Sequence, residues 1–108
     1  LRRTEGDARE IVRFGNVEVA PARGEVRVSG KLVEMTPMEF KLLLAFAKNA
    51  GRVLSRDRLI DLAWGRDTFI ADRAVDAHIV NLRRKIEPNA SEPRHIVSVR
   101  GIGYRFEA

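Results

Sequence analysis

The fold of this chain is decided by one stretch, Asp72-Arg73-Ala74-Val75-Asp76-Ala77-His78-Ile79-Val80-Asn81-Leu82-Arg83-Arg84-Lys85-Ile86-Glu87. Its larger apolar residues recur every three or four positions, which puts them on one stripe of an α-helix: Val75, Ile79, Leu82 and Ile86. The opposite face carries Arg73, Ala77, Val80 and Arg84, with Ala74 and Asn81 beside them. From Arg73 to Ile86 there are four Lys or Arg residues and one acid, Asp76. The pattern predicts a helix that lies against a negatively charged partner.

The composition bounds the class of protein. A length of 108 residues fits one domain with its own core, and a net charge of +5 suits a polyanionic partner, although a basic protein without such a partner has the same charge. The absence of cysteine excludes disulfides, thiolate metal sites and cysteine nucleophiles. No apolar run approaches the roughly 18–20 residues of a membrane span, and no signal-peptide pattern opens the chain. We therefore expect a soluble intracellular protein with no membrane contact.

The part of the chain before residue 36 predicts a small antiparallel sheet. Residues 1–10 are polar and lack apolar periodicity, which is typical of a linker, and the initial Leu suggests a fragment of a longer chain. Four short alternating runs follow, separated by Gly-, Asn- and Pro-containing turns: Ile11–Phe14, Val17–Ala20, Glu25–Val28 and Lys31–Glu34.

Two further helices are predicted before the basic one. Thr36 can cap the first, Pro37 suits its first turn and Glu39 completes a capping box, while Gly51 is a plausible stop. Its apolar stripe consists of Phe40, Leu43, Leu44 and Ala47. The second runs from Ser55 to Trp64, and Asp72 can cap the third.

The C-terminal segment predicts a hairpin. Two alternating runs, His95–Arg100 and Tyr104–Phe106, flank a turn at Gly101-Ile102-Gly103. A short helix, a connection and a basic helix form a helix-turn-helix unit, whose last helix can enter the major groove of DNA. A basic hairpin after it, residues 94–107, can act as a wing that carries an arginine into the minor groove. The order of elements therefore favours binding to double-stranded DNA.

Six motifs in this order resemble one family, the winged helix-turn-helix effector domain of OmpR/PhoB-type bacterial response regulators. They are Thr36-Pro37-Met38-Glu39-Phe40-Lys41-Leu42-Leu43, Gly51-Arg52-Val53-Leu54-Ser55-Arg56, Leu62-Ala63-Trp64-Gly65, Arg73-Ala74-Val75-Asp76-Ala77-His78-Ile79, Leu82-Arg83-Arg84-Lys85-Ile86-Glu87 and Val99-Arg100-Gly101-Ile102-Gly103-Tyr104-Arg105-Phe106. The resemblance covers Val12 to Phe106.

The resemblance implies an α+β fold with an N-terminal four-stranded antiparallel sheet, a three-helix core and a C-terminal β-hairpin wing. Residues 1–10 would be an interdomain linker remnant and 11–108 the DNA-binding domain of a cytoplasmic transcription regulator in a two-component phosphorelay. Its receiver domain would precede the chain. The family generally binds tandem direct repeats as head-to-tail dimers. The loop after its second helix often contacts RNA polymerase, here Gly65, Arg66, Asp67, Thr68, Phe69, Ile70 and Ala71.

The resemblance also implies roles for single residues. Trp64, Arg73 and His78 match positions at phosphates or the groove edge, Arg83 a DNA contact, Arg100 the minor-groove arginine and Tyr104 a wing residue near the DNA backbone. Base reading falls to Ala77, Val80, Asn81 and Arg84. This chain departs from many members at Ala74, Val80 and Asn81. Asn81 can pair with adenine, Arg84 can reach guanine, and Val80 or Ala77 can pack on a thymine methyl.

Other interpretations of the same residues remain open. Trp64, Tyr104 and Phe106 can be packing residues, and His78 a half-buried flank of its helix. The spacing of His78 and His95 suggests no metal site, and no catalytic arrangement is present, so we expect neither enzyme activity nor a cofactor. The alternative function is a winged helix that binds another protein. The basic face argues against it, because an interaction-only module would not need one.

Overall fold

The computed structural model describes residues 11–65 and 72–108. The chain divides into two compact units, one ending at Met35 and the other beginning at Thr36. Among the described residues, no helix is both long and apolar enough to cross a membrane.

The first unit is an antiparallel sheet in the order β1-β2-β3-β4. Its strands are β1 (Val12–Phe14), β2 (Val17–Ala20), β3 (Glu25–Val28) and β4 (Lys31–Val33). Each strand pairs with its sequence neighbours, so the four predicted runs form a simple meander. Val17 and Val19 are buried, whereas the side chain of Glu18 between them is 45% exposed. The alternation seen in the sequence therefore follows the two faces of the sheet.

The second unit begins with α2 (Pro37–Lys48), and its start is the predicted capping box. The Thr36 hydroxyl accepts the Glu39 N–H at 3.1 Å, and the Glu39 carboxylate accepts the Thr36 N–H at 3.0 Å. The helix ends before the predicted stop at Gly51. Asn49 caps it instead, because its side chain donates to the Ala45 carbonyl at 2.8 Å and its N–H donates to Phe46 O.

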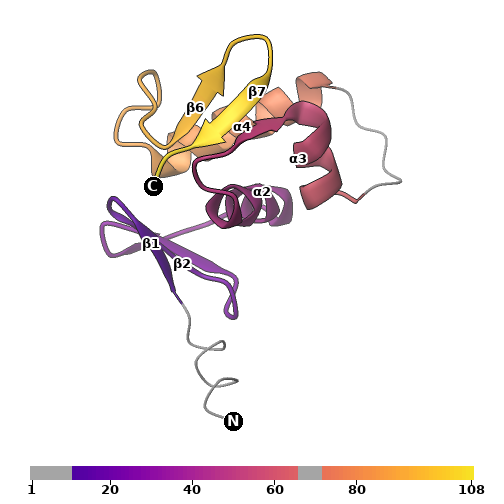
Figure 1. Ribbon diagram of the computed structural model, residues 1–108. Helices are drawn as coiled ribbons and strands as arrows, with labels where there is room; N and C mark the ends of the chain where they lie inside the picture. Colours follow the sequence, from indigo (N-terminus) through magenta and orange to yellow (C-terminus); the bar gives the residue numbers. More distant parts are fainter. Residues whose placement is uncertain (1–10, 66–71) are drawn as a thin grey trace. The chain divides into compact units, whose positions relative to one another are not determined.

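The other two helices complete a shared apolar core. They are α3 (Arg56–Ala63), capped by the Ser55 hydroxyl, and α4 (Asp72–Ile86). The structure does not describe the Asp72 side chain, so its capping role stays a prediction. Fully buried residues from all three helices form this core: Leu42, Leu43, Phe46, Leu59, Val75, Ile79 and Leu82. Figure 1 shows the C-terminal hairpin beside α4. The three predicted helices are confirmed.

The hairpin belongs to a three-stranded antiparallel sheet, ordered β5-β7-β6. Its strands are β5 (Val53–Ser55), β6 (Ile96–Val99) and β7 (Gly103–Phe106). Strand β5 was not predicted, because it leads directly into α3 and its pairing partner, β7, lies far along the sequence. Gly103 pairs with Ser55, and a Cβ at position 103 would lie 2.1 Å from the Leu54 carbonyl oxygen. Glycine is therefore required here by the close approach of β5.

Candidate nucleic-acid interface

The outer face of α4 is exposed, as its periodicity predicted. The exposed residues are Arg73, Ala77, Val80, Asn81 and Arg84, with Ala74 and His78 half-buried. Val80 is 44% exposed, which is high for a branched apolar side chain. The opposite stripe, from Val75 to Ile86, is buried. The structure therefore brings all four base-reading candidates onto one accessible surface, the outer face.

The four basic residues of α4 fall into two groups. Lys85 Nζ lies 2.6 Å from Oε1 of Glu39, whose side chain is only 4% exposed. Arg83 is half-buried and turned toward the hairpin, as described below. Arg73 and Arg84 remain exposed. The positive charge of the outer face therefore comes from two arginines rather than from all four basic residues.

Arg83 links α4 to the first strand of the hairpin. Its Nε donates to the Ile96 carbonyl and its Nη2 to the Ser98 hydroxyl, both at 2.9 Å. Its guanidinium lies over the ring of Tyr104, 5.5 Å from the centroid. Arginine has five N–H donors, and these bonds leave others that could contact a phosphate. The hairpin therefore fixes the position of this guanidinium.

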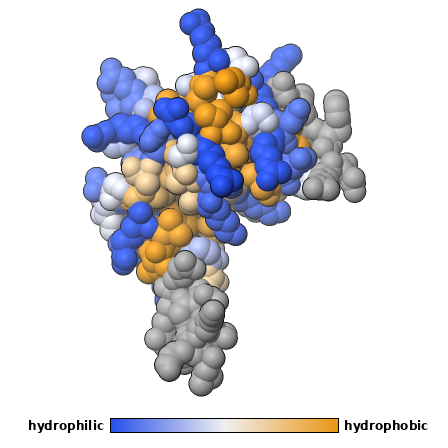
Figure 2. All heavy atoms as spheres, in the orientation of Figure 1, coloured by the Kyte–Doolittle hydropathy of each residue, from blue (hydrophilic) through white to orange (hydrophobic). Residues whose placement is uncertain are grey.

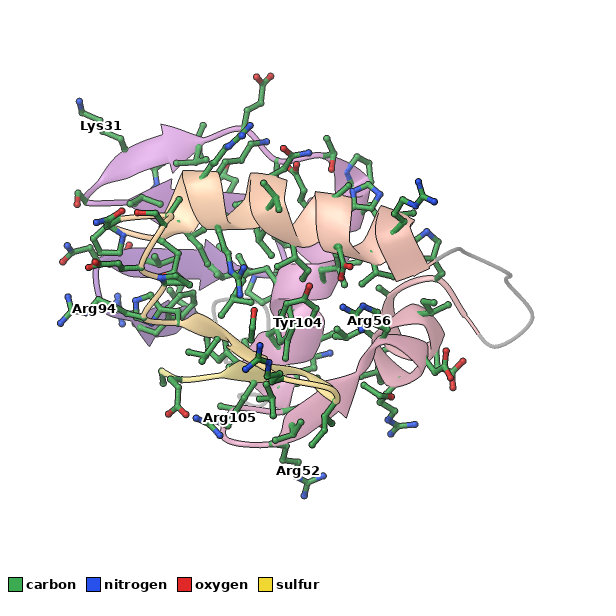
Figure 3. All side chains as sticks on the ribbon, turned by 90° about the horizontal axis from the view of Figure 1, so that it is seen from above. Lys31, Arg52, Arg56, Arg94, Tyr104 and Arg105 are labelled. Carbon is green, nitrogen blue, oxygen red and sulfur yellow. The ribbon has the colours of Figure 1, made fainter. Side chains whose placement is uncertain are left out.

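Asp76, the acid of α4 between Arg73 and Ile86, lies where this helix meets α3 and β7. Arg56 donates from Nε to Oδ1 at 2.9 Å and from Nη2 to Oδ2 at 3.3 Å. The Tyr104 hydroxyl donates to Oδ1 at 2.6 Å, and Figure 3 shows Tyr104 between the hairpin and α4 with Arg56 beside it. We call Arg56, Asp76 and Tyr104 the Tyr104 cluster. It joins three elements that are distant in the sequence.

The pKa values of Asp76 and Tyr104 both favour the hydrogen bond within the Tyr104 cluster. The hydrogen bonds from Arg56 hold the pKa of Asp76 below its ordinary value, with a further contribution from Tyr104. Burial and the hydrogen bond to Asp76 raise the pKa of Tyr104 to about 12. At neutral pH the carboxylate is therefore charged and the phenol keeps the proton that it donates.

Tyr104 is 6% exposed, so the geometry favours its packing role over the direct DNA contact that the resemblance implied. Arg56 and Asp76 were not predicted as site residues. Their positions differ by 20, and neither side chain shows a pattern that points to the other. The one signal available was an isolated acid in a basic helix.

Glu87 follows α4 and holds the start of the hairpin. Its carboxylate accepts the backbone N–H groups of Arg94 at 2.8 Å, His95 at 3.0 Å and Ile96 at 2.8 Å. Glu87 is 8% exposed, so its charge is compensated inside the protein. No role for Glu87 was predicted, because its partners are backbone groups that leave no trace in the sequence.

The tip of the hairpin is a tight turn from Val99 to Ile102. The Ile102 N–H donates to the Val99 carbonyl at 3.0 Å, and Gly101 has φ +77°, as the third residue of a type II turn requires. Arg100 is exposed and Ile102 is 56% exposed. Figure 2 shows apolar surface over the hairpin, bordered by hydrophilic side chains. The predicted minor-groove arginine is therefore displayed at the tip of the wing.

Trp64 packs against α4 at the end of α3. Its ring centroid lies 5.5 Å from that of His78, with the planes tilted by 55°. Both residues are half-buried, so the contact supports the packing interpretation and leaves part of each ring accessible at the edge of the outer face. Gly65 follows, and Arg66–Ala71 lie outside the described residues, so the polymerase-contact loop stays a prediction.

His95 is buried in the hairpin sheet. Its Nδ1 lies 2.9 Å from the Glu107 carbonyl oxygen, and its ring stacks on Phe106 with centroids 6.2 Å apart. Within residues 11–65 and 72–108, no group of three or more His, Asp or Glu side chains could hold a metal ion.

Known proteins similar to this chain are regulators of transcription. A relative from Mycolicibacterium smegmatis, the DNA-binding response regulator MtrA, is 35% identical over 105 residues, covering 97% of this chain and 46% of that protein. The alkaline phosphatase synthesis transcriptional regulatory protein PhoP of Bacillus subtilis is 41% identical over 94 residues, covering 87% of this chain and 39% of that protein. This chain therefore spans less than half the length of these relatives.

Solved structures share the fold. Response regulator DrrB of Thermotoga maritima, an OmpR/PhoB homologue, superposes with a TM-score of 0.82 at 32% identity, covering 99% of this chain and 48% of that one. The DNA-binding domain of Klebsiella pneumoniae RstA, solved in complex with the RstA box, gives a TM-score of 0.80 at 33% identity. This match covers 91% of this chain and 97% of that one. The family model described as "Transcriptional regulatory protein, C terminal" matches residues 30–106. This chain belongs to that family of OmpR/PhoB-type winged helix-turn-helix domains.

Proposed function

We propose that this domain binds double-stranded DNA in a sequence-specific manner and regulates transcription as the effector domain of a bacterial two-component response regulator. One observation carries the proposal. The outer face of α4 and the tip of the hairpin expose arginines, whereas Asp76 and Glu87 are held by internal partners. Among the side chains that the structure describes there, the acids are paired and the arginines are exposed, which gives the positive surface that a duplex requires.

The division of roles follows from exposure and chemistry. In the major groove, Asn81 would pair with adenine, Arg84 would reach guanine, and Ala77 and Val80 would pack on thymine methyl groups. Arg100 would enter the adjacent minor groove. Arg73 on the outer face would position the phosphate backbone, together with His78, Trp64 and Arg83. The RstA domain in complex with the RstA box supports this arrangement as a similar domain bound to its site.

The most direct test is a selection from random duplex DNA, followed by fluorescence anisotropy on the selected site. Asn81→Ala should cost about 1–3 kcal/mol on that site and relax one base position. Arg100→Ala should weaken binding and lower the slope of log K against log salt by about one. Equal losses on selected and scrambled duplexes would exclude base reading by Asn81. Absence of salt-dependent binding at micromolar protein would instead favour the protein-interaction module.

The proposal extends to the assembled protein. The domain would follow a receiver domain in the same chain, act in the bacterial cytoplasm and bind tandem direct repeats as a dimer. The loop Gly65–Ala71 would contact RNA polymerase. The selection also tests the repeat, because a tandem site would appear as two half-sites in the same orientation. A single half-site, or an inverted pair, would contradict head-to-tail binding.

A further inference from the structure

The wing is joined to α4 at two levels. Near its base, Glu87 accepts three N–H groups from residues 94–96, and Arg83 donates to the Ile96 carbonyl. On the last strand, Tyr104 donates to Asp76 at 2.6 Å. Tyr104 pairs with Ser98 and follows Gly103, so its strand leads directly from the tip that carries Arg100. The Tyr104 cluster therefore connects this strand with the helix turn next to the base-reading candidates.

The Tyr104 cluster combines a rigid link with charge compensation. Arg56 holds both oxygens of Asp76, which fixes the carboxylate and offsets the one negative charge of α4 between Arg73 and Ile86. Two guanidinium groups lie near the phenol ring, with Arg56 at 5.9 Å and Arg83 at 5.5 Å from its centroid. These contacts and the hydroxyl bond hold the ring against the helix.

We propose that Tyr104 is a positioning residue for DNA binding. Its bond to Asp76 holds the hairpin at the spacing from α4 at which Arg100 and the outer face engage one duplex together. A wing without this bond has to be ordered when DNA binds, which lowers affinity without removing a phosphate contact. This inference rests on the proposed function and adds to it a residue that acts through Arg100 rather than on DNA itself.

A double-mutant cycle tests the proposal on the selected duplex. Tyr104→Phe keeps the ring and removes the donor, so binding should weaken about tenfold with the salt slope unchanged. Arg100→Ala should cost clearly less in the Tyr104→Phe background than in the wild type, because without Arg100 the loosened wing no longer has to be ordered when DNA binds. Additive losses, or an unchanged affinity for Tyr104→Phe, would overturn the proposal.

Two further variants separate positioning from loss of stability. Thr36→Ala removes the cap of α2 and destabilises the fold without changing the charge or the wing. Its effect on binding should therefore be additive with that of Arg100→Ala. Asp76→Ala breaks the bond from the other side and should couple to Arg100→Ala as Tyr104→Phe does. Coupling in the Thr36 cycle, or its absence in the Asp76 cycle, would also overturn the proposal. Failure of the wild type to bind duplex DNA would refute the proposed function itself.

Discussion

The hydroxyl of Tyr104 donates a 2.6 Å hydrogen bond to Oδ1 of Asp76, so a strand of the wing is bonded directly to the second turn of α4. Burial and this bond together raise the pKa of Tyr104, which links the alkaline stability of the domain to the geometry of its wing. Because the sequence contains one tyrosine, this bond can be observed by titration without labels.

Tyr104 should titrate at a pKa of about 12 in the folded domain and near the ordinary 10.0 in urea. A phenol whose pKa is raised on folding stabilises the folded state fully below pH 10, and the stabilisation is lost as the pH rises toward 12. Tyrosinate absorbance measures the titration, and Tyr104→Phe should remove this component of the alkaline loss of stability. Titration near pH 10 in the folded domain would contradict the buried hydroxyl bond.

Asp76 should contribute to acid sensitivity. Its pKa lies below the ordinary 3.8, so its stabilisation is present above about that pH and is lost as the pH falls through the lower folded value. Unfolding in urea, followed from neutral to acidic pH, should show a weaker acid dependence for Asp76→Asn than for the wild type. Parallel curves for the two proteins would show that the ion pair with Arg56 adds nothing.

Lys85→Met should destabilise the domain by about 1–3 kcal/mol, measured by urea unfolding. Burial alone would raise the pKa of Glu39, and the hydrogen bond from Lys85 is the leading cause that lowers it instead. Without Lys85 the buried carboxylate keeps its desolvation cost and loses this partner. The double variant Lys85→Met with Glu39→Gln should recover part of the loss, and no recovery would show that the alkyl chain of Lys85 matters more than its charge.

Glu87→Gln should cost about 2 kcal/mol, because an amide presents one acceptor oxygen and an NH₂ group to three backbone donors. Glu92→Gln is the matched control, since Glu92 is exposed and the change should stay within about 0.5 kcal/mol. Urea unfolding measures both free energies. Equal effects would mean that the carboxylate of Glu87 does not hold the hairpin.

Gly103→Ala should destabilise the domain by more than about 2 kcal/mol, because its Cβ would meet the Leu54 carbonyl oxygen and backbone that cannot move aside. Gly101→Ala is the control from the same turn. Nothing lies within 4 Å of a Cβ there, and its φ of +77° should cost only about 1 kcal/mol. Thermal unfolding of the two variants separates the clash from the backbone strain. A smaller loss at position 103 than at 101 would contradict the β5–β7 pairing.

Several elements were predictable because their determinants are local. The capping box of Thr36 and Glu39 lies within four residues, and the stripe from Val75 to Ile86 repeats at the period of one helix. The four strands of the first unit were correct to within a residue at either end. Family motifs then supplied the winged helix-turn-helix order, which the solved structures share.

Strand β5 and the roles of Arg56, Asp76 and Glu87 were not predictable. Strand β5 has no neighbouring strand next to it in the sequence and is recognised only by its pairing with the distant β7. Lys85 and Arg83 were counted with the basic surface, although Lys85 binds Glu39 and Arg83 binds the hairpin. Their partners lie 46 and 13 positions away, beyond any local pattern.

By itself, the sequence determined which residues form each helix, which face of α4 is apolar and that its opposite face is basic. Those properties depend on period and composition, which act over one or two turns. The tertiary structure alone decided which charges are exposed. Ion pairs and hydrogen bonds form between elements that meet only after folding, so Asp76, Lys85 and Glu87 are paired within the protein, whereas Arg73, Arg84 and Arg100 are exposed.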